Sequence, residues 1–145
     1  MESHNPFVGA WKLISWRHIN LKGVVTYPCG PHPIGYLLYT QDGYMATEVM
    51  DPDRHLRDTS LPPERVLSET LPEKERLNDQ VTFLAYCGTY SYSIQEEMMT
   101  HSVKASSIPS WVGKDQSRHF EFKNGNLFLT HKGAEIIWEK AVRRA

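Results

Sequence analysis

His101 is the titratable residue whose position in the sequence best suits it to chemistry. It lies in the segment Met98–Ala105, where apolar and polar residues alternate, so in a β-strand its side chain shares a face with Met99 and Val103. An imidazole that faces an apolar cavity can accept and return a proton near neutral pH. The alternative is a buried histidine whose ring nitrogens are bound by neighbouring groups. The sequence leaves both interpretations open.

Two tyrosines on the preceding segment are the expected partners of His101. Tyr90 and Tyr92 lie in Gly88–Ile94, and a turn near Gln95–Glu97 would pair this segment with that of His101. Directly opposed residues of antiparallel strands lie within about 5 Å of each other. We therefore predict a catalytic site in which Tyr90 or Tyr92 hydrogen-bonds to His101. The alternative for each tyrosine is a ring in the sheet with its hydroxyl at the surface.

Arg118 is the charged residue that we expect to complete this site. In the strand-like segment Asp115–Lys123 it shares a face with Phe120 and Phe122, whereas His119 falls on the other face. A guanidinium stays charged when it is partly buried, and it stacks on aromatic rings. Arg118 is thus a candidate clamp for a ligand carboxylate, phenolate or enolate.

Five further side chains are expected to contact a ligand. Trp111 lies in the loop around Pro109, where no strand pairing would require its large ring, so it suits a lid or a stacking surface. Glu48 would act as an acid or base only if its carboxylate faced inward, whereas a carboxylate on a strand is usually exposed to solvent. The five residues are Trp16, Tyr36, Glu48, Trp111 and Phe120.

The composition excludes several classes of function. Sixteen Lys and Arg residues against seventeen Asp and Glu give a net charge of -1, so the chain offers no basic field for nucleic acid or an anionic membrane. The seven histidines lack the spacing of a metal site, and neither a phosphate loop nor a Gly-x-Gly-x-x-Gly motif is present. We therefore expect no metal and no cofactor.

The elements that must position these residues are mainly strands. Asp42-Gly43 and Asn124-Gly125 are typical of tight hairpins, and short aromatic segments lie on both sides of such turns. Residues 61–86 differ, because Leu77, Val81 and Leu84 follow helical spacing. We predict one domain over residues 1–145, a mainly β, closed antiparallel barrel of eight to ten strands with a short helical insertion at about 61–86.

Several motifs together carry a resemblance to a known family. They are Gly9-Ala10-Trp11, the run Pro28–Tyr39, Asp42-Gly43-Tyr44-Met45, Tyr86–Tyr90, Thr100–Val103, Pro109–Gln116 with Arg118 and Phe120, and Gly125-Asn126-Leu127. In this order and spacing the chain resembles the small lipocalin-like domain proteins of bacteria and fungi. The resemblance implies a calycin-type barrel in which Trp11 closes one end and packs against a basic residue from a late strand. Arg118 is one candidate for that residue.

Two functions follow from these expectations. The first is a cofactor-free cyclase or isomerase, or a dehydratase or pericyclase, that acts on an apolar or aromatic secondary-metabolite intermediate and needs only orientation, exclusion of water and a few polar groups. The second is a non-catalytic binder or carrier of a hydrophobic metabolite. We expect a cytoplasmic protein, because the first residues do not resemble a secretory signal. A homodimer is an assembly that the sequence allows.

Overall fold

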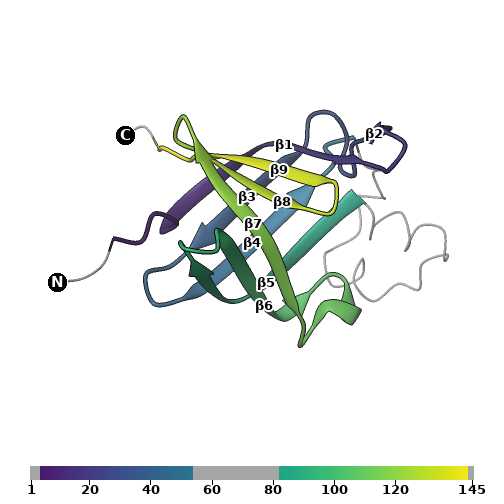
Figure 1. Ribbon diagram of the computed structural model, residues 1–145. Helices are drawn as coiled ribbons and strands as arrows, with labels where there is room; N and C mark the ends of the chain where they lie inside the picture. Colours follow the sequence, from purple (N-terminus) through teal and green to yellow (C-terminus); the bar gives the residue numbers. More distant parts are fainter. Residues whose placement is uncertain (1–3, 54–81, 144–145) are drawn as a thin grey trace.

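The computed structural model describes residues 4–53 and 82–143, which form a β-barrel (Figure 1). The strands alternate buried and exposed residues, and a single turn of 3-10 helix, η1, interrupts them. In chain order the elements are β1 (Gly9–Ile19), β2 (Val25–Thr26), β3 (Ile34–Tyr39), β4 (Tyr44–Met50), β5 (Phe83–Ser93), β6 (Met98–Ser106), η1 (Pro109–Trp111), β7 (Asp115–Lys123), β8 (Asn126–His131) and β9 (Ala134–Lys140).

The barrel is closed by hydrogen bonds between its first and last strands. From β3 to β9 each strand pairs antiparallel with the next, β1 pairs with β3, and β1 also pairs with β9 along most of its length. The two-residue β2 pairs only with the far end of β1. The fold is therefore an eight-stranded antiparallel barrel with one extra strand, and the predicted mainly β, closed architecture is confirmed.

Turn chemistry explains why the strands reverse where they do. Asn124 and Gly125 have φ values of 53° and 81°, so the hairpin between β7 and β8 has two consecutive residues with positive φ. Such a turn matches the right-handed twist of the flanking strands, and Asn-Gly adopts it at little cost. The predicted hairpin at this dipeptide is confirmed.

The predicted helical insertion extends too far toward the C-terminus. Residues Phe83–Tyr86 belong to β5, in which Leu84 is buried within the barrel and Ala85 faces outward. Leu84 fits the helical spacing that begins at Leu77 and Val81, and it also fits the alternation of a strand. The segment is a strand because its backbone pairs with that of β4. Residues 61–81 of the predicted insertion lie outside the described residues. None of the helical structure that is described is long and apolar enough to cross a membrane.

Aromatic side chains fill the barrel end at which the N-terminal segment enters. The Phe7 ring is fully buried, and it lies 4.8–5.8 Å, centroid to centroid, from four other rings. Trp11 donates its Nε1–H to the carbonyl oxygen of Phe7 over 2.8 Å. The four rings around Phe7 are those of Tyr39, Tyr92, Phe120 and Phe122. This end of the barrel is thus a solid core.

Lys140 is the basic residue that packs against Trp11. Its Nζ lies 4.4 Å from the centroid of the Trp11 ring and donates a hydrogen bond to the carbonyl oxygen of Val8 over 2.7 Å. Lys140 ends β9, a late strand, as the resemblance implied. The suggestion that Arg118 covers Trp11 is therefore wrong, and the packing of Trp11 does not account for the position of Arg118.

Candidate functional site

A small cavity lies inside the barrel, beyond the aromatic end. Its volume is about 50 Å³. One water molecule needs about 10–15 Å³ of such free space, so the cavity has room for roughly four waters or for a chemical group of similar size. All eight barrel strands and η1 contribute to its wall, which is formed by Trp16, Leu37, Thr47, Val49, Leu84, Tyr86, His101, Trp111, Arg118, Leu129, Ile136 and Trp138.

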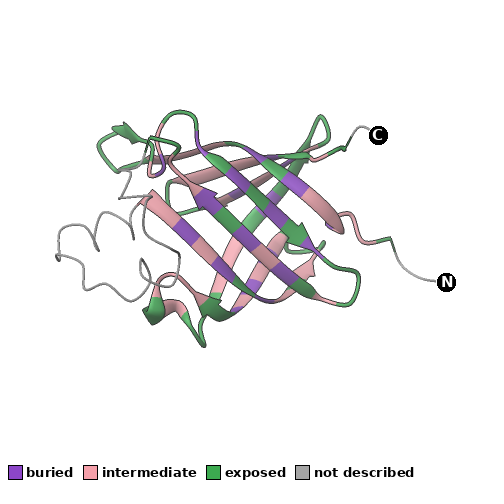
Figure 2. Cartoon of the chain, turned by 180° about the vertical axis from the view of Figure 1, so that it is seen from behind, coloured by how far each residue is buried: buried purple, intermediate pink, exposed green. Residues whose placement is uncertain are grey.

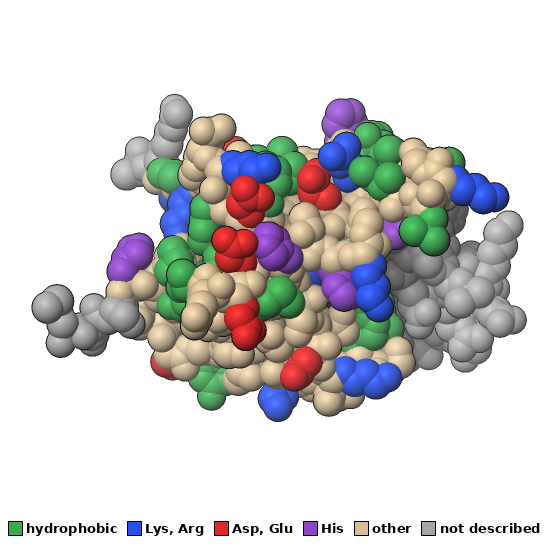
Figure 3. Space-filling view, in the orientation of Figure 1, with side chains coloured by type: hydrophobic (Ala, Val, Ile, Leu, Met, Phe, Trp, Pro, Cys, Tyr) green, Lys and Arg blue, Asp and Glu red, His purple; other side chains and the backbone are tan. Residues whose placement is uncertain are grey.

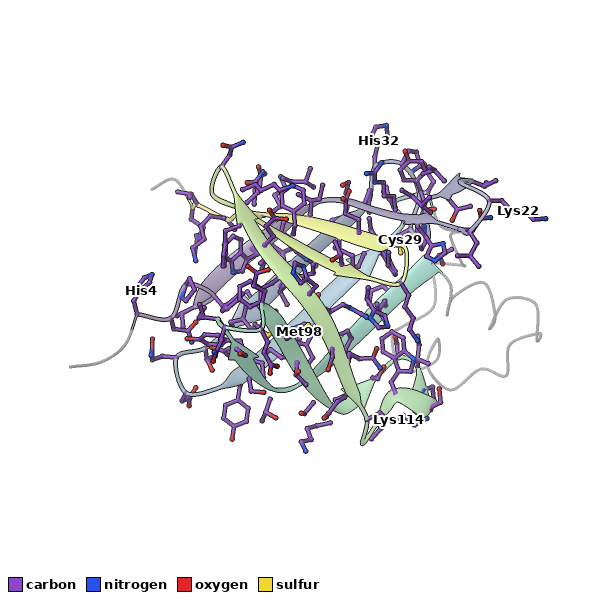
Figure 4. All side chains as sticks on the ribbon, viewed as in Figure 1. His4, Lys22, Cys29, His32, Met98 and Lys114 are labelled. Atoms are coloured by element: carbon purple, nitrogen blue, oxygen red, sulfur yellow. The ribbon has the colours of Figure 1, made fainter. Side chains whose placement is uncertain are left out.

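His101 lies between the cavity and the aromatic core. The residue is 2% exposed, and both ring nitrogens are hydrogen-bonded to tyrosine hydroxyls. Figure 4 shows how side chains from the strands fill the interior of the barrel. Nε2 lies 2.6 Å from Tyr39 Oη, and Nδ1 lies 2.7 Å from Tyr86 Oη. Alternation along β6 directs the imidazole inward, as predicted. Its partners come from β3 and β5 and are not the predicted Tyr90 or Tyr92.

The surroundings of His101 keep the imidazole neutral. Burial, together with the nearby positive charge of Arg118, lowers the pKa of His101 from 6.5 to about 3. Burial also raises the pKa of Tyr86 to about 12 and raises that of Tyr39 well above its usual value of 10. At neutral pH the three groups therefore form an uncharged chain. His101 is too weak a base in this state to act as the proton acceptor that its position suggested.

The burial of the two tyrosines determines the direction of this hydrogen-bonded chain. A neutral imidazole carries one N–H, so one tyrosine donates to the ring and the other accepts from it. If Tyr39 were the acceptor, its own O–H would have no acceptor among the described residues, whereas the O–H of Tyr86 borders the cavity, where a water or a ligand can accept it. Leaving a buried donor unpaired costs about 1–3 kcal/mol. We conclude that Tyr39 donates to Nε2 and that Nδ1–H donates to Tyr86.

Tyr86 can consequently donate its own hydroxyl proton into the cavity. Its ring forms part of the cavity wall and lies 5.8 Å from the Trp111 ring in an edge-on arrangement. With the direction inferred above, its oxygen accepts from Nδ1–H of His101 over 2.7 Å, so its O–H is available to a ligand. The site therefore presents a hydrogen-bond donor that is oriented by two residues behind it.

Two more hydrogen-bond donors belong to the same wall. Arg118 is half-buried, and within the described part of the chain it forms no hydrogen bond or ion pair. Trp138 Nε1 is buried and has no hydrogen-bond partner there either. The other polar wall residue, Thr47, donates its hydroxyl proton to the carbonyl oxygen of Tyr36 over 2.9 Å. The cavity thus combines apolar walls with a surplus of donors and one positive charge.

The structure brings only some of the predicted site residues together. His101, Arg118, Trp16 and Trp111 all line the cavity. Tyr92 and Phe120 lie in the aromatic core beside Phe7. Of the remaining three predicted residues, Tyr90 bonds elsewhere while Tyr36 and Glu48 face out of the barrel.

Tyr90 is opposite His101 in the register of β5 and β6, but its hydroxyl bonds elsewhere. It donates to the carbonyl oxygen of Thr40 over 2.7 Å and accepts from the Asn5 side chain over 3.0 Å. Tyr36 and Glu48 point out of the barrel, and Tyr36 is 49% exposed. These two residues do not reach the cavity.

Sequence reasoning missed the donors that matter most. Tyr86 fell at the end of the expected helix, so its inward direction was not recognised, although alternation from Leu84 would have indicated it. Tyr39 contacts His101 across the barrel and not along a neighbouring strand, and local sequence carries no signal of such a contact. Trp138 follows strand alternation in β9 and could have been found in that way.

A family model for the lipocalin-like domain matches residues 8–145. The chain belongs to the lipocalin-like domain family. Among solved structures, that of an uncharacterized protein from Bacteroides eggerthii DSM 20697 is similar with a TM-score of 0.47 and 10% sequence identity, over 93% of this chain and 99% of that one. Among curated proteins, none matches the chain. A lipocalin-like barrel with an internal cavity fits the binding of a small molecule.

Proposed function

We propose that this lipocalin-like barrel binds a small, largely apolar or aromatic molecule through one anionic or hydrogen-bond-accepting group. The observation that supports this most directly is the surplus of donors in the cavity wall: Arg118 has no acceptor there among the described residues, and Tyr86 has none when Nδ1–H of His101 donates to it. A ligand oxygen would receive hydrogen bonds from both. Trp16 and Trp111 line the same cavity, and in this proposal they contact the apolar remainder of the ligand.

Matched probes test this proposal. Benzoate and benzylammonium share one ring and differ in the sign of their charge, and quenching of the wall tryptophans reports on binding. We expect benzoate to bind more tightly, and Arg118→Gln to weaken benzoate binding by about tenfold to a hundredfold, because a hydrogen bond to a charged group contributes about 1.5–3 kcal/mol. Equal affinity for both probes, or preference for the cation, would contradict the proposal.

A second candidate is a cofactor-free isomerase or cyclase that uses the same two donors. In an apolar cavity, a cation and an oriented hydroxyl can stabilise an enolate oxygen that develops during a rearrangement. Proton relay through the tyrosine–histidine chain is not required and is disfavoured, because it would leave Tyr39 as a buried phenolate whose pKa is raised. What supports this candidate is the convergence of Tyr86 and Arg118 on one space.

The tautomerisation of phenylpyruvate separates the two candidates. This substrate is aromatic and anionic, and its enol and keto forms interconvert through an enolate, with solvent water taking up the proton and returning it at the other atom. An isomerase should accelerate the reaction, and Tyr86→Phe should reduce the rate by about a hundredfold to a thousandfold, the usual range for the loss of one oxyanion donor. Benzoate binding without any acceleration would leave the protein a binder.

A further inference from the structure

The outer surface of β3 differs from that of β7 in its apolar character. Its three outward residues, Ile34, Tyr36 and Leu38, are 50%, 49% and 46% exposed and lie in one row along the strand. The outward residues of β7 are polar, namely Ser117, His119, Glu121 and Lys123. Figure 3 shows charged side chains spread over the face of the barrel that carries β7. Figure 2 shows the molecule from behind, with the β3 side of the barrel toward the viewer. A contiguous row of three exposed apolar side chains is a candidate interaction surface.

Opposite charges flank this row at its centre. Lys12 of β1 is the register partner of Tyr36, and Glu48 of β4 is its partner on the other side. Both charged residues are exposed, and neither forms an ion pair within the described ranges. A positively charged, an aromatic and a negatively charged side chain therefore follow one another across β1, β3 and β4. Small residues flank Leu38 in the same way, because its register partners are Ala10 and Ala46.

We propose that this face, made by the outward residues of β1, β3 and β4, joins two copies of the chain in a symmetric dimer. A two-fold axis that runs along β3 in the plane of the interface exchanges the two sides of the row. Each Lys12 then faces Glu48 of the other copy, and the residues of β3 pack against themselves. A symmetric dimer requires such a self-complementary patch.

The arrangement also gives a role to two residues that the cavity does not use. Tyr36 and Glu48, expected from the sequence to bind a ligand, lie on this outer face. An aromatic centre with charged residues beside it is the usual anatomy of a protein interface. The alanines beside Leu38 leave room for the side chain of the opposing copy.

The oligomeric state in solution tests the proposal. Light scattering during gel filtration, from micromolar to near-millimolar concentration, should give twice the chain mass of 16.7 kDa. Leu38→Glu should give a monomer that keeps the far-ultraviolet spectrum of the barrel. Ile94→Glu is the matched control, since Ile94 is 60% exposed in the turn after β5 and should leave the dimer intact.

Charge reversal tests the direction of the axis. Lys12→Glu and Glu48→Lys should each weaken the dimer by about tenfold or more, because each places like charges opposite one another. The double variant restores the pairing and should return the affinity toward that of the unaltered protein. A monomer at every concentration would overturn the proposal and leave the face to a different partner. A dimer that survives Leu38→Glu, or a double variant weaker than both single ones, would overturn it as well.

Discussion

At the scale of single residues, the tyrosine–histidine–tyrosine chain shows how burial fixes chemistry. Alternation along β6 was sufficient to predict that His101 faces inward. One of its two hydrogen-bond partners, Tyr39, could not be predicted, because it reaches His101 from β3, a strand that is not a neighbour of β6. The partners also bear on the role of the residue: both ring nitrogens of His101 are bonded to tyrosine hydroxyls, so neither is available to accept a proton from a ligand.

The tautomer of His101 is a direct prediction of this assignment. In protein labelled with ¹⁵N at histidine, we expect Nδ1 of His101 to carry the proton and Nε2 to be unprotonated, because Tyr39 is the tyrosine that must donate. The signals that are missing from His101→Gln identify the residue. A proton on Nε2 would show that the chain runs in the opposite direction and that Tyr86 donates to the ring instead of to a ligand.

His101 should also make stability depend on pH. The unfolded chain binds a proton at this residue below about pH 6.5, whereas the folded protein does not bind it until about pH 3. The free energy of unfolding should therefore fall by about 1.4 kcal/mol per pH unit as the pH decreases from 6.5 toward 3.

Urea unfolding at several pH values measures this slope. The control is His101→Gln, which is expected to be less stable at pH 7, where it loses the imidazole contacts, but to lack this part of the pH dependence. Identical slopes for the two proteins would mean that His101 titrates normally in the fold.

At the scale of elements, local signals in the sequence predicted hairpins well and the start of β5 poorly. The Asn124-Gly125 turn is specified by two adjacent residues that tolerate positive φ. The beginning of β5 depends on pairing with β4, a long-range contact, while the spacing from Leu77 to Ala85 fits a helix equally well. For this reason the site predicted from the sequence did not include Tyr86. Errors in the site thus followed from an error in one element.

Gly88 tests how closely β5 and β6 approach each other. The register between these strands shifts at Cys87 and Gly88, and a Cβ added at Gly88 would overlap the backbone carbonyl of Ser102. Because backbone atoms cannot move aside cheaply, Gly88→Ala should lower the free energy of unfolding by roughly 1–3 kcal/mol. Cys87→Ala, at the exposed neighbouring position, should change it by less than about 0.5 kcal/mol. Equal effects in urea unfolding would refute the close approach.

At the scale of the whole molecule, the two parts of the barrel interior differ: one is filled by aromatic side chains, and the other contains the cavity. The aromatic cluster around Phe7, covered by the contact of Lys140 with Trp11, makes one end solid. Beyond it, all eight strands share the wall of the cavity. The sequence predicted the closed barrel because alternation and turns recur along the chain. It could not divide the interior into a core and a cavity, since this depends on how side chains from distant strands fill the same volume.

This shared wall predicts that a ligand stabilises the barrel as one unit. No single strand or hairpin contains the site, so the unfolded chain should not bind benzoate, and binding should act only on the folded state. At a benzoate concentration of about 100 times its dissociation constant, the free energy of unfolding should rise by about 2.7 kcal/mol. The urea midpoint should move upward without a change in the m-value, because the surface exposed on unfolding stays the same. Arg118→Gln, at the same benzoate concentration, should show a smaller shift. Protein concentration must be held constant throughout, because a dimer adds its own concentration dependence. If fluorescence reports saturation while the midpoint does not move, benzoate binds the unfolded chain equally well and the internal cavity is not its site.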